Sequence, residues 1–81
     1  MRIEILLFAG AAEKVGQRSV ALEVGPEATL QEVADALRAA HPQLSTMLPS
    51  SRWAVDQQFA PLSTKLVGRE EIAFIPPVSG G

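Results

Sequence analysis

Apolar residues recur with a period of two at both ends of this 81-residue chain, and this alternation most restricts its possible folds. Residues 2–9 carry isoleucine, isoleucine and leucine at every second position, as a half-buried β-strand does. Residues 18–24 and 71–75 repeat the pattern. A chain this short favours one domain with one core. We therefore expect a small sheet that uses strands from both ends of the chain.

One stretch between these strands has helical periodicity. Thr29 and Glu32 have the spacing of a capping box, and apolar residues follow at the helical spacing of three and four. Pro42 ends this pattern, because proline disfavours helical geometry in the residue before it. We expect a loop over residues 10–17, an irregular polar segment over 42–51, a short strand over 52–56, a turn with one loose helical turn over 57–66, and a turn over 67–70.

This order of elements predicts an α+β fold. A mixed sheet with one main helix across a single face buries the apolar side of each element. The last strand can lie parallel beside the first, since the segment between them is long enough for a crossover connection. The expected fold is the ubiquitin-like β-grasp. We expect residues 1–77 to form this domain and residues 78–81 to form a flexible C-terminal tail.

Charge and composition exclude several classes of function. Seven basic and nine acidic residues give a formal net charge of −2, which does not favour binding to nucleic acid or to an anionic membrane. The absence of cysteine excludes disulfides, thiolate metal sites and a cysteine nucleophile. No apolar run is long enough to span a bilayer. Glu4 interrupts the basic start that a signal peptide would need, so we expect a cytoplasmic protein.

The body of the domain shows no recognisable active site. His41 is the only histidine, and its place at the end of the helix suits an exposed residue near the negative end of the helix dipole. Glu70 and Glu71 are neighbours on an extended segment, so their carboxylates point to opposite sides. Residues 10–16 lack the Lys-Ser/Thr of a phosphate-binding loop. Trp53 is expected in the core.

The C-terminus is the candidate for chemistry. Pro76 and Pro77 cannot donate ladder hydrogen bonds, so they should direct the chain out of the sheet. Gly80 and Gly81 carry no Cβ and can enter a narrow channel. The Gly81 α-carboxylate, with a reference pKa of about 3.5, is a poor electrophile until it is activated as an acyl-adenylate. A sulfur nucleophile can then displace AMP. The alternative is an idle, frayed end.

A second feature indicates a partner. If the first and last strands are neighbours, Leu6, Phe8, Ala73 and Ile75 share the outer face of the sheet, and Phe59 emerges near them. An apolar patch of this kind marks a contact surface, and aromatic residues at its centre would anchor a partner. We call these five residues the outer-face patch. The alternative is that residues 42–51 fold over it.

The sequence resembles a known family, the small subunit of molybdopterin synthase, a ubiquitin-like sulfur carrier of molybdenum cofactor biosynthesis. The decisive stretch is residues 71–81, EIAFIPPVSGG, supported by residues 7–10, LFAG, and residues 54–57, AVDQ. Ala12 and Asp56 depart from residues common in the family, as does the turn over 67–71. The resemblance spans essentially the whole chain.

The resemblance implies a reaction at Gly81 and an interface with a partner. Gly81 would be adenylated at the expense of ATP by an enzyme related to those that activate ubiquitin, then thiocarboxylated from a sulfur donor. It would donate sulfur to cyclic pyranopterin monophosphate inside the large subunit, in a heterotetramer, with no permanently bound cofactor or metal. The catalytic side chains would belong to the large subunit. The expected partner interface comprises Phe8, Phe59, Ile75, Pro76, Pro77, Val78 and Ser79.

Three alternatives remain open at this stage. A sulfur carrier for thiazole synthesis shares the fold and the Gly-Gly end. A protein modifier would use the same acyl-adenylate but would be joined to lysine amines. A non-covalent β-grasp interaction module would have an idle tail, so that loss of Gly81 would leave its binding intact.

Overall fold

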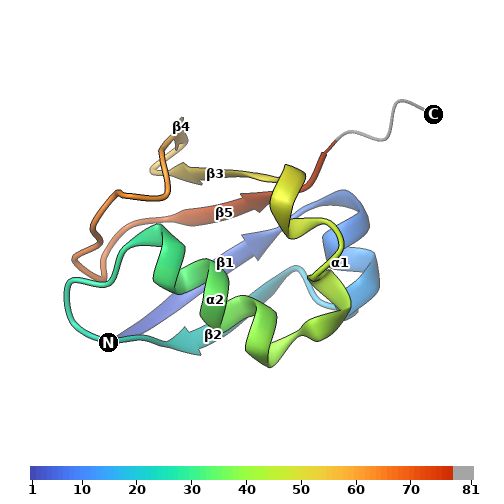
Figure 1. The fold of residues 1–81 in the computed structure, drawn as a ribbon, viewed down its shortest axis with the longest axis horizontal. Helices are drawn as coiled ribbons and strands as arrows, with labels where there is room; N and C mark the ends of the chain where they lie inside the picture. Colours follow the sequence, from blue (N-terminus) through green and yellow to red (C-terminus); the bar gives the residue numbers. More distant parts are fainter. Residues whose placement is uncertain (78–81) are drawn as a thin grey trace.

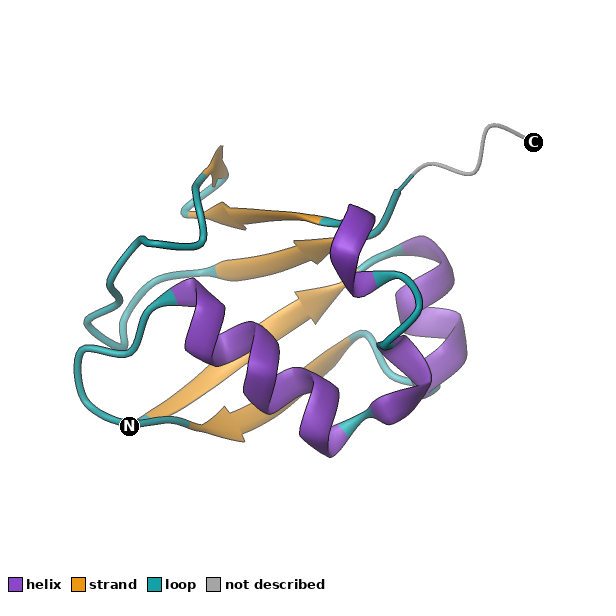
Figure 2. Ribbon diagram, viewed as in Figure 1, coloured by secondary structure: helices purple, strands orange, loops and turns teal. Residues whose placement is uncertain are grey.

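The computed structural model describes residues 1–77. They form a five-stranded mixed sheet with the strand order β2-β1-β5-β3-β4, covered on one face by helices (Figures 1 and 2). The elements in chain order are β1 (Arg2–Leu7), α1 (Ala9–Val15), β2 (Ser19–Glu23), α2 (Leu30–Ala40), η1 (Pro42–Leu44), η2 (Leu48–Ser50), β3 (Arg52–Val55), β4 (Gln58–Phe59) and β5 (Ile72–Ile75), where η denotes a 3₁₀ helix.

The two ends of the described chain meet in the middle of the sheet. Strand β1 is antiparallel to β2 and parallel to β5, and β5 is antiparallel to β3. In Figure 1 the arrows of β1 and β5 accordingly point toward the same end of the molecule. The parallel pairing is possible because α2 and the following segments carry the chain over one face of the sheet. The predicted β-grasp arrangement is confirmed.

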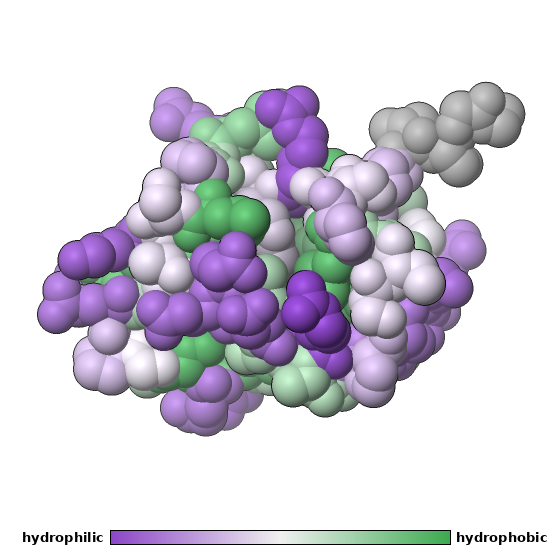
Figure 3. Space-filling view, viewed as in Figure 1, coloured by the Kyte–Doolittle hydropathy of each residue, from purple (hydrophilic) through white to green (hydrophobic). Residues whose placement is uncertain are grey.

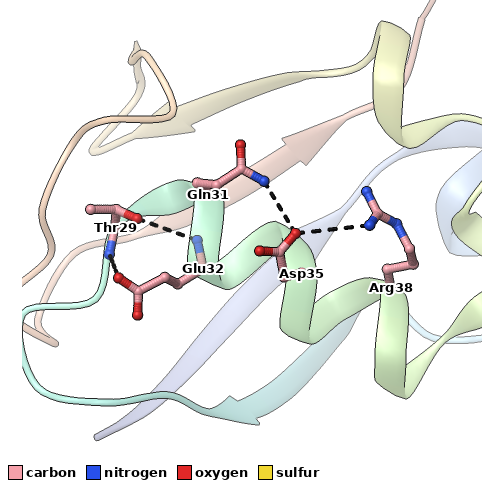
Figure 4. Close-up of polar contacts among 5 residues, drawn as sticks. All are labelled: Thr29, Gln31, Glu32, Asp35 and Arg38. Atoms are coloured by element: carbon pink, nitrogen blue, oxygen red, sulfur yellow. Dashed lines mark hydrogen bonds and ion pairs between the residues drawn. The ribbon is translucent and has the colours of Figure 1, made fainter.

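Helix α2 begins at the predicted capping box. The Glu32 amide donates to Thr29 Oγ1 at 3.3 Å, and the Thr29 amide donates to the Glu32 carboxylate at 3.5 Å (Figure 4). These reciprocal bonds satisfy amide groups that have no partner within the helix. The side of α2 that faces the sheet buries Leu30, Val33, Ala34 and Leu37. Burial of this apolar stripe holds α2 across the sheet.

The core lies between α2 and the inner face of the sheet. Phe74 on β5 is fully buried, and its ring centroid lies 5.1 Å from that of Trp53 on β3, with a tilt of 56°. Tilted aromatic pairs at this separation add to the stabilisation from buried area. No polar or charged residue among residues 1–77 is buried. The domain is therefore stabilised chiefly by apolar packing, and its charges lie at the surface.

The expected loop over residues 10–17 is wrong. Residues 9–15 form the helix α1, which buries Ala11 and ends at Gly16 in the left-handed conformation, with φ of 81°. Glycine adopts this conformation without a steric penalty, and it commonly ends helices. The helix shows little apolar periodicity because Ala11 alone among its residues is buried. A pattern based on large apolar residues therefore misses it.

Two other segments are more ordered than expected. The polar segment over 42–51 contains η1 and η2, which anchor Leu44 and Leu48 in the core. After β3, Asp56 and Gln57 both have positive φ, 50° and 69°, as in the two-residue turn of a tight hairpin. The short strand β4 follows in the segment for which a turn and one loose helical turn were expected, and residues 57–66 form no helix. Residues 42–51 are held by the core, whereas β4 is held by its pairing with the neighbouring strand β3.

The surface over α2 is predominantly polar. Figure 3 shows this face, where hydrophobic residues form separated areas among hydrophilic ones. Charged and amide side chains along the exposed side of α2 account for part of this character. Within residues 1–77, no helix combines the length and the apolar character needed to cross a bilayer.

Candidate functional site at the exit of the C-terminal strand

The chain leaves the sheet from its centre. Strand β5 has β1 on one side and β3 on the other, and its last paired residue, Ile75, lies opposite Arg52. Pro76 is buried, whereas Pro77 is exposed. Because neither proline has an amide hydrogen, the hydrogen-bond ladder cannot continue past Ile75 on the donor side. The predicted exit at the proline pair is confirmed.

An apolar hollow of about 490 Å³ adjoins this exit. Its lining comes from three parts of the chain: the start of α1, the segment between η1 and η2, and the end of β5. The lining residues are Phe8, Ala9, Gly10, Met47, Ile75, Pro76 and Pro77. None of them carries a charge, so the hollow is suited to an apolar side chain of another protein.

Strand register places the outer-face patch as expected. Leu6 lies opposite Ala73, which lies opposite Ala54, which in turn lies opposite Phe59. These four residues therefore form one row across the outer face, on four adjacent strands. Ile75 is two residues beyond Ala73 and shares its side of the sheet. Phe8 follows β1 in an extended conformation, with φ of −126° and ψ of 154°.

Exposure within the patch is uneven. Phe8 is 47% exposed and Phe59 is 59% exposed, so the two rings present most of the apolar surface. Ala73 is only 8% exposed. The Arg52 guanidinium lies over the Phe59 ring, 3.8 Å from its centroid. The patch therefore consists of two exposed aromatic residues with partly covered aliphatic residues between them.

Residues 42–51 do not cover Phe8 and Phe59. Leu44 and Leu48 point into the core instead, and η1 contacts α1 and α2. Met47 alone among these residues lines the hollow beside Phe8. The alternative in which residues 42–51 shield the two phenylalanine rings is therefore wrong, because both rings are exposed. Leu44 and Leu48 of this segment pack into the core instead.

The reactive-looking residues of the body have structural roles or exposed positions. His41 caps the C-terminal end of α2 and donates its amide to the Leu37 carbonyl. The described residues contain no cluster of three potential metal ligands. Glu71 donates its amide to Asp56 Oδ1 at 2.9 Å. As expected, Glu70 and Glu71 do not form a carboxylate pair for acid–base chemistry.

Glu70 instead holds the turn that precedes β5. Its carboxylate accepts hydrogen bonds from the amides of Val67 at 2.8 Å, Gly68 at 2.9 Å and Arg69 at 3.1 Å. Burial by itself would raise the pKa of Glu70, but the backbone hydrogen bonds outweigh it and hold this pKa below its usual value. The carboxylate thus acts as the internal acceptor of a tight loop.

The terminal part of the predicted site lies outside the described residues. It comprises Val78, Ser79, Gly80 and Gly81, together with the expected flexible tail over 78–81. The other predicted site residues are described: the hollow at the exit is lined by Phe8, Ile75, Pro76 and Pro77, and the outer face carries Phe59. Their role as a partner interface stays a prediction, as does the division of the chain after residue 77.

Comparison with known proteins decides the family. The model of the ThiS family matches residues 5–81, which is nearly the whole chain and includes the C-terminal Gly-Gly. The chain belongs to the ThiS family. The match covers the exit, the hollow and the outer face of this ThiS-family chain together. The expected resemblance to the sulfur carrier of molybdopterin synthase is also confirmed, since several relatives are named molybdopterin synthase sulfur carrier subunit.

Two relatives illustrate the range of names. The Chlamydomonas reinhardtii molybdopterin synthase sulfur carrier subunit is 32% identical to the ThiS-family chain, with 100% of both chains covered. The Haloferax volcanii small archaeal modifier protein 1 is 33% identical, over 98% of this chain and 100% of that protein. Both matches are full-length. The comparison therefore covers the same single domain in each case.

Solved structures support the fold. The crystal structure of SAMP1 from Haloferax volcanii matches the ThiS-family chain with a TM-score of 0.87 and 34% identity, over 100% of both chains. A Helicobacter pylori complex of subunits 1 and 2 of molybdopterin-converting factor gives a TM-score of 0.69 at 22% identity, over 100% of both chains. Caldiarchaeum subterraneum ubiquitin gives 0.66 at 20%, over 100% of this chain and 98% of that chain. At these lower identities the likeness concerns the fold alone.

Sequence reasoning missed part of the hollow in the ThiS-family chain. Ala9, Gly10 and Met47 line it but were not singled out as candidates. A signal for α1 was present, because Lys14 lies in its last turn and Gly16 follows directly, which is typical of a helix C-terminus. No local pattern indicates that Met47 lines the hollow at the end of β5, since its position depends on how the two 3₁₀ helices pack.

Proposed function

We propose that this chain is the sulfur-carrier small subunit of molybdopterin synthase. In this role the Gly81 carboxylate is adenylated, converted into a thiocarboxylate, and donates its sulfur to cyclic pyranopterin monophosphate. The transfer takes place in the active site of the large subunit, and it contributes to the dithiolene of molybdopterin. The chain presents the sulfur, whereas the catalytic side chains belong to the partner.

The activation proceeds in two balanced steps. A carboxylate oxygen of Gly81 attacks the α-phosphorus of ATP, which forms the acyl-adenylate and releases pyrophosphate. Hydrosulfide then attacks the acyl carbon, and the bond to the AMP oxygen breaks. AMP and one proton are released, and the chain now ends in a thiocarboxylate. AMP is a good leaving group, whereas an oxide leaving directly from the carboxylate is not. Because the chain has no cysteine, no internal thiol can capture the activated end.

The described residues supply presentation and binding. Pro76 and Pro77 take the chain out of the sheet at its centre and restrict its backbone. The hollow, with Phe8 in its lining, adjoins this exit, and the exposed ring of Phe59 lies two strands away on the outer face. Burial of these apolar surfaces by a partner would stabilise the complex. The partner would thereby grip the domain while it receives the last residues.

Full-length relatedness carries the proposal. Relatives named molybdopterin synthase sulfur carrier subunit match essentially every residue of this chain, at 32% and 34% identity in Chlamydomonas reinhardtii and Homo sapiens. The family model extends through Gly81. The central exit of β5 supports the same assignment, because it gives the C-terminal residues a defined point of departure.

Intact-protein mass spectrometry tests the chemistry. The chain is incubated with ATP, a sulfide source and the activating enzyme of its own organism. We expect a product in which one terminal oxygen is replaced by sulfur, and no product from a variant lacking Gly81. An unchanged mass, under conditions that charge a known sulfur carrier with its own activating enzyme, would contradict the proposal. Co-purification with a thiazole synthase rather than a pterin synthase subunit would assign the sulfur to thiazole synthesis.

A second candidate function is supported by a specific relative. The small archaeal modifier protein 1 of Haloferax volcanii matches this chain over its full length, both in sequence and in structure. A modifier would use the same acyl-adenylate: a neutral lysine ε-amine, rather than sulfide, would attack the acyl carbon, and the bond to the AMP oxygen would break, which gives an isopeptide and releases AMP and a proton. Tryptic peptides of other proteins in which a lysine carries residues 70–81, the segment that follows the last basic residue of this chain, would support it. Their absence from cells that contain the thiocarboxylate would exclude it.

A further inference from the structure

A second depression lies at the opposite edge of the sheet from β2. This groove of about 570 Å³ runs between α2 and the edge formed by β3 and β4. Gln31 and Arg38 line it from α2, and Arg52, Trp53 and Phe59 line it from the strands. Its volume is in the range of sites that hold small ligands or a few side chains. The hollow at the β5 exit shares none of its lining residues.

The groove is preformed by backbone hydrogen bonds. The amides of Leu30 and Gln31, at the start of α2, donate to the carbonyls of Thr64 at 3.0 Å and Leu62 at 2.9 Å. These bonds tie the segment after β4 to the first turn of the helix. They also satisfy helix amides that have no partner within α2. A site whose walls are already fixed loses less conformational entropy when it binds.

The lining of the groove is basic in an acidic protein. It includes Arg38 and Arg52 but no aspartate or glutamate, although the chain has a formal charge of −2. Gln31, Asp35 and Arg38 follow one another along α2, with 3.1 Å between Gln31 Nε2 and Asp35 Oδ1 (Figure 4). The ion pair of Arg38 with Asp35 is 3.8 Å long and about half exposed at both side chains. Such a pair is weak, so Arg38 can turn to another carboxylate.

Arg52 is held by an aromatic ring. Its guanidinium lies 3.8 Å from the Phe59 ring centroid, which orients the group and leaves its in-plane N–H donors available. A planar guanidinium of this kind binds a carboxylate through two parallel hydrogen bonds. The rest of the lining is mixed, because Gln31 and Ser51 are polar, while Phe59 and Leu62 are exposed apolar residues. The groove thus combines two cationic groups with two exposed apolar side chains.

The groove is continuous with the surface proposed to receive the partner. Phe59 belongs both to the groove and to the outer-face patch. Arg52 lies directly opposite Ile75, the last paired residue before the chain leaves the sheet. A protein that contacts the outer face around β5 therefore needs to extend over only two strands, β3 and β4, to enter the groove.

We propose that this groove binds an acidic segment of the large subunit, with a carboxylate between Arg38 and Arg52 and apolar side chains against Phe59 and Leu62. The inference rests on the proposed function, since it names a second contact of the same partner. The two arginines favour a carboxylate by charge, and the exposed side chains of Phe59 and Leu62 favour apolar residues beside that carboxylate. The contact would fix the orientation of the domain while the C-terminal residues enter the partner.

Calorimetric titration with the purified large subunit of the same organism tests this contact. The groove variant is Arg38→Gln/Arg52→Gln, and its matched control is Arg2→Gln/Arg18→Gln, which removes the same charge from exposed residues outside the groove. We expect the groove variant to bind about tenfold more weakly and the control to change less than about twofold. Added salt should reduce the affinity of the wild type more than that of the groove variant.

Folding is checked separately. Arg38→Gln alone changes an exposed helix residue, so it should keep the fold even if the double variant does not, and it should still weaken binding by about threefold. In spectra of the ¹⁵N-labelled chain, the amides of Ala60 and Leu62 should shift when the wild type binds. An Arg52→Lys variant keeps the positive charge but loses the planar guanidinium, so its affinity should lie between those of the wild type and the groove variant.

Each outcome separates the groove from the function. Wild-type affinity in the groove variant would overturn the groove and leave the sulfur carrier standing. An equal loss in the groove variant and its control would assign the effect to overall charge, which also overturns it. Failure of the wild type to bind the large subunit, with thiocarboxylate still formed, would refute the partner and the groove together. Absence of the thiocarboxylate with intact groove-dependent binding would refute only the chemistry.

Discussion

Leu6 on β1 lies directly opposite Ala73 on β5 in parallel register. The outer face of the first strand therefore continues into the last one, although 67 positions separate the two residues in the sequence. This pairing brings Phe8 to the exit of the chain, where it lines the apolar hollow together with Ile75 and Pro77. Surface residues from both ends of the domain thereby form one face.

Phe8→Asp should weaken binding to the large subunit without unfolding the domain. Phe8 is 47% exposed in the free chain, so an aspartate there is solvated until the partner covers it. Burial of the unpaired carboxylate in the complex is costly, and we expect at least about tenfold weaker binding. Val67→Asp is the matched control, because Val67 is 76% exposed and lies outside both the hollow and the groove. Equal affinities of both variants in calorimetry would refute the interface.

Glu70→Gln should lower the free energy of unfolding in a pH-dependent way. The depressed pKa of Glu70 means that the ionised form is favoured by the folded state, so its contribution is present above the unfolded pKa of about 4.3. We expect a loss of about 0.5–1 kcal/mol near neutral pH, discounted for exposure. The difference between variant and wild type should disappear as the pH falls through the folded pKa. Urea unfolding as a function of pH measures it.

If the difference in the free energy of unfolding between Glu70→Gln and the wild type stayed constant as the pH was lowered, the proposed role of the Glu70 charge would be contradicted. Glu71→Gln serves as the control, because the Glu71 side chain makes no hydrogen bond in the described structure. Its effect on unfolding should be small at every pH. The comparison separates the turn that Glu70 stabilises from a general change in net charge, since both variants remove one negative charge.

Gly68→Ala should destabilise the domain more than Gly16→Ala. Both glycines have positive φ, 96° and 81°, which costs an alanine about 1 kcal/mol. At Gly68 a Cβ would also approach the Met1 sulfur at 3.1 Å, whereas nothing lies within 4 Å of a Cβ at Gly16. We expect losses of about 2 kcal/mol and about 1 kcal/mol, measured by thermal or urea unfolding. The Met1 side chain is flexible, so equal losses would show that it moves aside.

Thr29→Ala should destabilise α2 by about 1 kcal/mol, because the Glu32 amide loses its acceptor. Thr29→Ser keeps the hydroxyl group and should retain most of the wild-type stability. Equal destabilisation by both substitutions would show that the methyl group of Thr29, rather than the cap, is responsible. Urea unfolding monitored by far-UV circular dichroism measures both.

Local patterns were sufficient to predict an element where the residues of that element alone show which side is buried. The alternation in β1, β2 and β5 and the capping box of α2 each depend on residues within one short segment. Proline at 76 and 77 likewise marks the end of the ladder without reference to the rest of the fold. The helix α1 was missed because its burial depends on one small residue, Ala11, and an alanine-rich helix shows no apolar stripe.

The sequence by itself determined the strands β1, β2 and β5, the helix α2 and the point where the chain leaves the sheet, because these follow from side-chain period and backbone chemistry. Only the tertiary structure decided which distant segments meet. It placed Met47 beside Phe8 and Pro77 in the hollow, and Arg38 on the same groove as Arg52 and Phe59. Such contacts arise from how η1, η2 and β4 pack onto the sheet, and packing depends on shape complementarity between residues that are remote in the chain.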